Sequence, residues 1–237
     1  IEARPKYPPI PVGFSILMPT AKKARYYAFG HSEGNNCTKE EATQVLQEAW
    51  QSGKPLLFHN AKFDVDVAQT HMGCGKIAWE LVHDTMFLLF LRDPHAATLS
   101  LKPAAAELLG MPAVERDAVK EWIFANRHLL PPDTKLGERT WGAWISKAPG
   151  KLVGEYAIGD VVRTRLLFDR LWAEINERGM IPAYDREREL LPFLMENERS
   201  GIRVDLKELR KDLKNYEAAS ATCDAYLRER LGVAELN

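Results

Sequence analysis

The sequence contains few cysteines and no long apolar run, and each absence excludes a class of protein. Its three cysteines are widely separated and odd in number, which argues against a disulfide framework and for reduced thiols: Cys37, Cys74 and Cys223. No apolar stretch reaches the roughly 18 residues that a membrane-spanning helix needs. No basic segment followed by an apolar one indicates a secretion signal. We therefore expect a cytoplasmic protein that does not enter a membrane.

The sequence also lacks a complete zinc motif and an excess of positive charge. His71, Cys74 and His83 lie close together, but the second Cys/His pair that a structural zinc site needs is missing. The 32 Lys and Arg residues are balanced by 33 Asp and Glu residues, so the formal net charge is −1. Nucleic-acid-binding domains are usually basic, but an enzyme that binds metal ions through carboxylates gains positive charge from those ions. Charge therefore neither supports nor excludes a nucleic-acid substrate.

The first half of the chain alternates short apolar strands with helices. Residues 12–18 and 24–29 are β-branched or aromatic runs separated by a Lys-rich turn, which predicts a hairpin. Residues 56–58 form a short apolar strand, and 77–82 are a second apolar run. Thr38, with a Glu three residues later, is typical of a helix N-cap. The helices predicted in this half cover residues 39–51, 61–72 and 85–91.

The second half is helical nearly throughout, with Pro and Gly residues between the segments. The predicted helices cover residues 101–109, 118–130, 140–145, 152–178, 186–199 and 206–231. Asp205 is the expected cap of the last one. Strands and helices followed by a helical half indicate an α/β domain with one sheet. We expect a domain boundary near residue 181.

Three carboxylates are placed where they can meet in one cleft. Glu2 precedes the predicted hairpin, Asp64 lies one turn into a helix that follows a buried strand, and Asp160 lies on the long helix. Tyr156, four residues before Asp160, shares its helix face. Carboxylates close together need a compensating cation to stay ionised, and Mg²⁺ and Mn²⁺ prefer oxygen ligands. Two such ions about 4 Å apart can activate water and stabilise a leaving 3′-oxygen, which favours a two-metal phosphodiesterase.

Each residue also has a plain structural interpretation. Asp64 alone would stabilise the N-terminus of its helix, and a lone Tyr-x-x-x-Asp pattern occurs in many helices. Asp84 follows a strand and precedes a helix, so we expect an N-cap and not a metal ligand. Phe63 is expected in the core, not as a platform for a stacked base. We assign no proton transfer to His59 or His83, because two-metal chemistry needs no histidine base.

Four short motifs occur in order along the chain. They are His59-Asn60-x-x-Phe63-Asp64, His83-Asp84-Thr85, Leu99-Ser100-Leu101-Lys102-Pro103 and Tyr156-x-x-x-Asp160. Together they resemble the DEDD exonuclease superfamily in its tyrosine-bearing subclass. More narrowly, they are similar to the proofreading domain of family A DNA polymerases, phage-type ones especially, over roughly residues 1–180. The resemblance implies a ribonuclease H-like mixed sheet flanked by helices. It also implies a 3′–5′ exonuclease that removes nucleoside monophosphates from DNA 3′ ends.

The resemblance assigns roles to individual residues. It implies three ligands for two Mg²⁺ or Mn²⁺ ions: Glu2, Asp64 and Asp160. The catalytic residues would be these three and Tyr156, whose phenol would hold the attacking water. Asn60 and Lys62 would face the terminal nucleotide or its phosphate.

The chain matches only part of the family's first motif, Asp-x-Glu. Ile1-Glu2 corresponds to its second half, so the Asp would directly precede Ile1 and we expect the chain to be a fragment. Residues 1–181 would be the exonuclease domain, and 182–237 resemble the helical start of a polymerase thumb module. The expected partners are a single-stranded DNA 3′ end and a polymerase module in the same polypeptide. We expect a monomer in a bacterial or phage-infected cell.

Two other functions stay open at this point. The same superfamily contains exoribonucleases of the RNase D type, although the thumb-like segment favours the polymerase family. A non-catalytic nucleic-acid-binding module is the other alternative, because one of four ligands is absent from the sequence and metal-site chemistry tolerates such a loss poorly.

Overall fold

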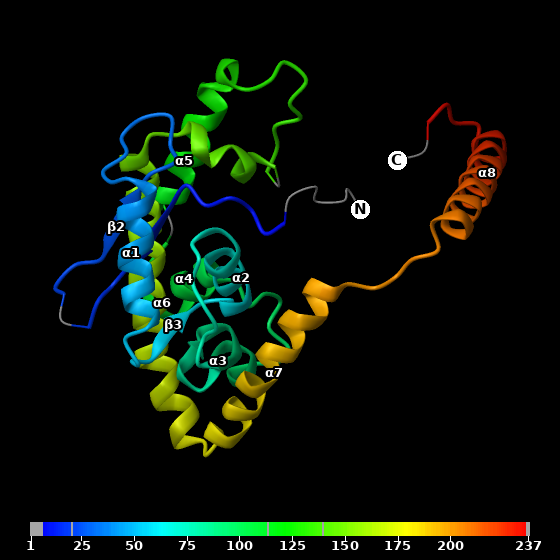
Figure 1. Ribbon diagram of the computed structural model, residues 1–237. Coiled ribbons are helices and arrows are strands. Elements are labelled where there is room, and N and C mark those ends of the chain that lie inside the picture. The colour runs from blue at the N-terminus through cyan, green and yellow to red at the C-terminus, as the bar shows by residue number, and fades with distance from the viewer. Residues whose placement is uncertain (1–6, 20, 113, 139, 236–237) are drawn as a thin grey trace. The chain divides into compact units, whose positions relative to one another are not determined.

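A computed structural model of the chain describes residues 7–19, 21–112, 114–138 and 140–235 (Figure 1). The chain divides into two compact units, Ile1–Met195 and Glu196–Asn237. The first unit carries both sheets and every core cluster, so the candidate site lies there.

The predicted hairpin is confirmed. Strand β1 (Gly13–Ile16) pairs antiparallel with β2 (Arg25–Ala28), with Gly13 opposite Ala28. Helix α1 (Lys39–Trp50) follows, and its predicted cap is also present. The Thr38 hydroxyl accepts the N–H of Glu41, while the Glu41 carboxylate accepts the N–H of Thr38. This reciprocal pair satisfies two backbone donors that the first helical turn would leave free.

A second sheet joins the two strands nearest the candidate site. Strand β3 (Leu56–Phe58) runs parallel to β4 (Val82–Asp84), with Phe58 opposite Asp84. The apolar run at 77–82 enters the strand only at its last residue, because a 3₁₀ turn, η1 (Trp79–Leu81), precedes it. Ile77 is buried, and it packs with Val82 in one core cluster instead of extending the strand.

The mixed α/β fold predicted from the sequence is confirmed, with one difference in the sheet. Among the described residues the strands form two separate two-stranded sheets, one antiparallel and one parallel, where a single sheet was expected. Strands β1 and β3 are not paired with each other; both line one large pocket.

Helices pack around these strands. In chain order they are α2 (Ala61–His71), α3 (Thr85–Arg92), α4 (Leu101–Leu109), α5 (Val114–Ala125), the 3₁₀ segments η2 (Arg127–Leu129) and η3 (Trp141–Lys147), and α6 (Gly150–Glu177). The helix predicted at 118–130 thus begins earlier and stops at Ala125, where the N–H and the side-chain amide of Asn126 both donate to the carbonyl of Trp122. The segment predicted at 140–145 is a 3₁₀ helix.

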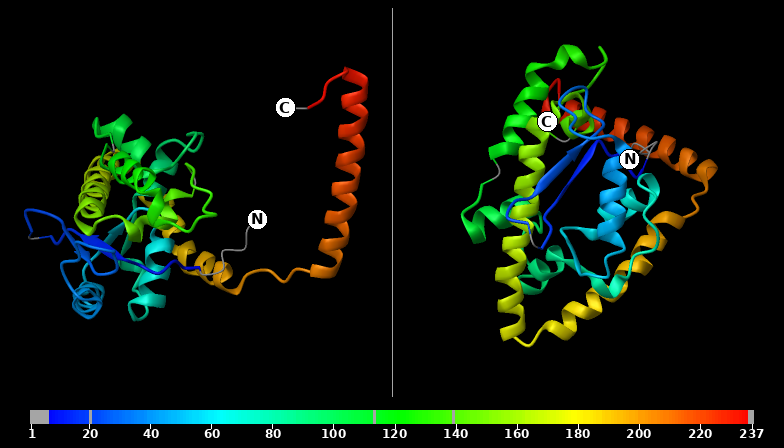
Figure 2. Two further views of the ribbon diagram at one scale, coloured as in Figure 1. Left: turned by 90° about the horizontal axis from the view of Figure 1, so that it is seen from above. Right: turned by 60° about the vertical axis from the view of Figure 1, so that its left-hand side comes forward.

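Helix α6 is the central element of the first unit. It packs against the β1–β2 hairpin, β3, α3, α4 and α5 (Figure 2). Its C-terminal half buries Leu167, Leu171 and Ile175 among the side chains of α3 and α4. Its N-terminal half packs Val153 beside Tyr26 of the hairpin. A residue on the middle of α6 is therefore held against both sheets.

The last two helices differ in burial. Helix α7 (Ile181–Ser200) buries Tyr184, Leu191 and Met195 in the cores of the first unit, so that unit extends beyond residue 181. Helix α8 (Leu206–Leu231) is exposed along its whole length and begins at the predicted cap Asp205, which accepts two backbone N–H groups. Of the helices that the structure describes, none is long and apolar enough to cross a membrane.

Candidate active site

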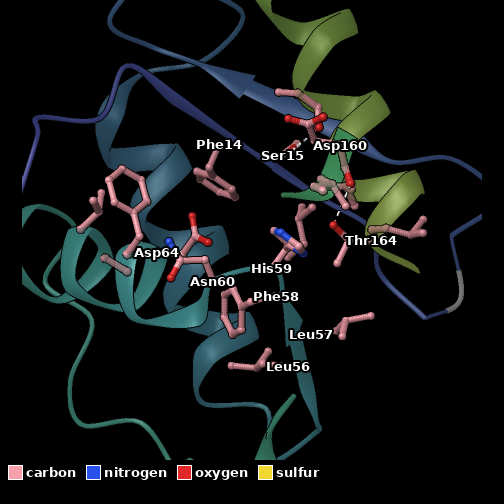
Figure 3. A pocket seen from close by; sticks show the side chains of 18 of the residues that line it. Phe14, Ser15, Leu56, Leu57, Phe58, His59, Asn60, Asp64, Asp160 and Thr164 are labelled. Carbon is pink, nitrogen blue, oxygen red and sulfur yellow. Dashed lines mark hydrogen bonds between the residues drawn. The ribbon is translucent and has the colours of Figure 1, made fainter. Parts of the chain in front are cut away.

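A pocket of about 1880 Å³ lies between the two sheets and brings together residues distant in sequence. Asp64 and Asn60 reach it from the beginning of α2, and Tyr156 and Asp160 reach it from α6. Figure 3 shows Asp64 and Asp160 on separate walls of this pocket, with Phe14, Phe58 and His59 also lining it. The pocket is the place where the sequence-predicted residues converge.

The α6 wall carries a carboxylate with two cations beside it. The Nζ of Lys102, at the start of α4, lies 2.8 Å from Oδ2 of Asp160 and 3.2 Å from the hydroxyl of Tyr156. It also lies 4.7 Å from the centre of the Tyr156 ring. On the other side, Nη1 of Arg163 is 3.6 Å from Oδ1 of Asp160. That Oδ1 atom is buried and accepts no hydrogen bond from the described part of the chain.

Arg163 is anchored by a second carboxylate. Its side chain is only 3% exposed, and its Nη2 lies 2.8 Å from both oxygens of Glu115 and from the carbonyl of Pro112. Burial opposes ionisation of Glu115, but the hydrogen bonds and the charge of Arg163 outweigh it and lower the pKa of Glu115. A Cβ at Gly159 would lie 2.5 Å from a Glu115 oxygen, so this ion pair packs directly on α6.

The α2 wall is positioned by a buried carboxylate. Asp84 is fully buried and accepts three backbone N–H groups: those of Asn60 at 3.0 Å, Ala61 at 2.7 Å and Met86 at 2.8 Å. Asn60 has a positive φ of 68°, and this left-handed turn directs the chain into α2. The expectation that Asp84 is an N-cap is confirmed, and its carboxylate additionally holds the beginning of the helix that carries Asp64.

Asp64 stands in an environment that disfavours its charge. Its side chain is exposed to the pocket, yet the surrounding walls remove much of the water that would stabilise a carboxylate. This desolvation, followed by the nearby charge of Asp84, raises the pKa of Asp64 to about 7. A cation in the pocket would favour the ionised form again.

Both histidines of the motifs have structural partners. Nδ1 of His59 lies 2.8 Å from the hydroxyl of Thr85, and burial lowers the pKa of His59 despite the opposing charge of Asp84. Nδ1 of His83 lies 3.2 Å from the hydroxyl of Tyr184, and its ring stacks on the Tyr184 ring. Burial, and then the charge of Arg188, lower the pKa of His83 to about 4.

Two predicted site residues remain, Glu2 and Lys62. Glu2 lies outside the described residues. Lys62 is on α2 but is not among the residues that line the pocket. Among the described residues, no group of three or more His, Cys, Asp and Glu side chains is arranged to hold a metal ion.

Phe63 was expected in the core, and this is wrong. Its side chain is 38% exposed and lines the pocket. The reason is helical geometry: the buried apolar residues of α2 are Ala61, Val65 and Ala68, and a residue at position 63 points away from the face that they share.

Lys102 is the residue whose role the sequence did not reveal. It belongs to a recognised motif, but no local pattern relates it to Asp160, which lies 58 residues further along the chain. The available signal was a lone Lys in the first turn of a mostly apolar helix, where a positive charge is unfavourable next to the helix N-terminus.

Comparison with known proteins agrees with this geometry. The family model for the exonuclease domain of family A DNA polymerases, described as 3′–5′ exonuclease, matches residues 18–176. No curated protein matches the chain. The matched range includes both walls of the pocket, from β2 to the last turns of α6.

Proposed function

The chain belongs to the 3′–5′ exonuclease family of family A DNA polymerases, and from this membership we propose a proofreading function. In this proposal it removes nucleoside monophosphates from single-stranded DNA 3′ ends by two-metal-ion hydrolysis. It does so for a polymerase module in the same polypeptide.

The proposal rests on the contacts of the two oxygens of the Asp160 carboxylate. One of its oxygens is in contact with the ammonium of Lys102, and the other is buried without a hydrogen bond from the described residues. The Arg163 guanidinium lies 3.6 Å from this second oxygen without a hydrogen bond, so the carboxylate keeps acceptor capacity that a bound cation could use. Mg²⁺ and Mn²⁺ are commonly held by one or two carboxylates together with substrate phosphate and water. Asp160, with Asp64 in the same pocket, fits that description.

Each residue would contribute a separate step. Asp64 and Asp160 would hold the ions, which supply water activation and stabilisation of the leaving oxygen when bound. The Tyr156 hydroxyl lies one helical turn from Asp160 and would orient the attacking water. Asn60 would hydrogen-bond the terminal nucleotide from the opposite wall. The exposed ring of Phe63 would stack on a base, which contributes about 1–3 kcal/mol per base in single-strand binding.

The test is degradation of a 5′-labelled single-stranded oligonucleotide with Mn²⁺ by the chain with an Asp and strand residues fused ahead of Ile1, which completes the Asp-x-Glu motif that the resemblance implies. We expect a ladder of products shortened one nucleotide at a time from the 3′ end. Asp64→Asn and Asp160→Asn should each reduce the rate at least about 100-fold, because each removes a charged metal ligand. Asp169→Asn is the matched control, since Asp169 lies on the same helix and pairs with Arg165 at the surface. Undiminished degradation by either of the first two variants would refute the assignment.

A non-catalytic nucleic-acid-binding module is the second candidate. It is favoured by the lack of a three-ligand cluster among the described residues. On the exonuclease proposal, the fusion that completes the Asp-x-Glu motif cleaves DNA. DNA binding without cleavage in that fusion would favour the binding module. Faster cleavage of a matched RNA strand would favour an exoribonuclease of the RNase D type.

A further inference from the structure

We propose that Lys102 is a positioning residue of this site, an inference that rests on the proposed exonuclease function. Its ammonium holds the Asp160 carboxylate and the Tyr156 hydroxyl together and contacts one oxygen of the carboxylate group that a divalent ion would use. Lys102 therefore has two opposite effects. It orients Tyr156 for turnover, and it competes with the ion for Asp160.

The geometry of α4 makes this contact specific. Helix α4 packs on α6 through the buried side chains of Ala104, Ala105 and Leu108. At its other end, Arg170 of α6 donates a hydrogen bond to the carbonyl of Leu108. The backbone of α4 is thus held on α6 along its length, and the Lys102 side chain reaches α6 from a defined starting point.

The two cations beside Asp160 are not equivalent. The Nη2 of Arg163 is hydrogen-bonded to both oxygens of Glu115, which neutralises much of its charge. Its Nη1 is 3.6 Å from Asp160, beyond a normal hydrogen bond. Lys102 makes a 2.8 Å contact with Asp160 on a flexible stem that is 22% exposed and lines the pocket. Lys102 is therefore the cation that can leave when another cation arrives.

The contact with Tyr156 adds a second function. The Lys102 ammonium lies 3.2 Å from the Tyr156 hydroxyl oxygen and can donate to it. This leaves the phenolic proton free to point into the pocket, and the cation–π contact at 4.7 Å steadies the ring. Without Lys102, the Tyr156 hydroxyl would lose the one side-chain hydrogen bond that fixes its direction in the described structure.

The first experiment measures Mn²⁺ binding to the 237-residue chain without DNA, from the electron paramagnetic resonance signal of free Mn²⁺. Lys102→Met removes the competing charge and keeps most of the side-chain volume, so we expect binding about threefold to tenfold tighter. Lys102→Arg should stay close to the parent. Lys120→Met is the matched control: Lys120 is 27% exposed and pairs with Glu138 away from the pocket. Unchanged binding in Lys102→Met, or no binding to either protein, would overturn competition at Asp160.

A second experiment needs no metal. In a thermal-denaturation cycle of Lys102→Met and Asp160→Asn, the double variant should melt at a higher temperature than the sum of the single losses predicts, because either change alone leaves a charge without its nearest partner. Additive losses would overturn the pairing.

In a cleaving form of the protein, Lys102→Met should lower kcat about tenfold with KM little changed, and Lys102→Arg should recover part of it. Inactive parent protein would count against the exonuclease function only, since the first two measurements do not depend on cleavage.

Discussion

The buried carboxylate of Asp84 permits a quantitative test of how the α2 wall is built. Three backbone N–H groups donate to it, from Asn60, Ala61 and Met86, and the residue is fully buried. Its own N–H donates to the hydroxyl of Tyr184. Removal of the carboxylate would leave three donors without an acceptor at the point where β3 turns into α2 and β4 turns into α3.

The magnitude follows from these three bonds. A hydrogen bond to a charged group contributes about 1.5–3 kcal/mol, and a buried unpaired donor costs about 1–3 kcal/mol. The losses do not add fully, because the freed groups share one site and relax together. We expect Asp84→Ala to lower the free energy of unfolding by about 3–5 kcal/mol, a large part of the 5–15 kcal/mol typical of a domain. Asp84→Asn keeps one acceptor oxygen and should lose about 1.5–3 kcal/mol.

The assay is urea unfolding followed by tryptophan fluorescence. All six tryptophans lie between residues 50 and 172, so the signal reports the first unit alone. Asp205→Ala is the control, because Asp205 also caps a helix but is exposed in the second unit. It should leave the fluorescence transition unchanged and cost about 1 kcal/mol in a helix-specific signal. If Asp84→Asn and Asp84→Ala both unfold within about 0.5 kcal/mol of the parent, the carboxylate does not organise this wall.

Three further outcomes are expected. The pKa of His83 is lowered to about 4, so the folded protein binds fewer protons there than the unfolded chain and stability falls as pH drops from about 6.5 toward 4. His83→Gln should flatten that part of a Tm-versus-pH curve, and an equally steep curve would contradict the assignment. A Cβ at Gly150 would lie 2.4 Å from the carbonyl oxygen of Gly34. Gly150→Ala should therefore lower the free energy of unfolding in urea by about 1–3 kcal/mol. The control Gly142→Ala, which has open space around it, should lower it by less than about 0.5 kcal/mol. Phe63→Ala should weaken binding of a fluorescent single-stranded oligonucleotide about fivefold to 100-fold, with little change in Tm. A large fall in Tm would show instead that Phe63 contributes to the core.

Local features could be predicted from the sequence because they depend on residues only a few positions apart. The capping box of Thr38 and Glu41, the cap at Asp205 and the hairpin all occur as expected. Asp84 as a cap was also foreseen, since a strand before it and a helix after it are visible in the pattern. The 3₁₀ geometry of η3 was not, because 3₁₀ and α-helical segments share a similar spacing of apolar residues over such a short length.

The order of the motifs by itself determined the family and the identity of Asp64, Tyr156 and Asp160 as candidates, because those residues sit in short patterns that remain readable without coordinates. Only the tertiary structure decided that Lys102 contacts Asp160 and that Phe63 faces the pocket. Both follow from how α4 and α2 pack against their neighbours. The direction of a side chain into a cavity depends on contacts between segments far apart in the chain, and no local spacing encodes them.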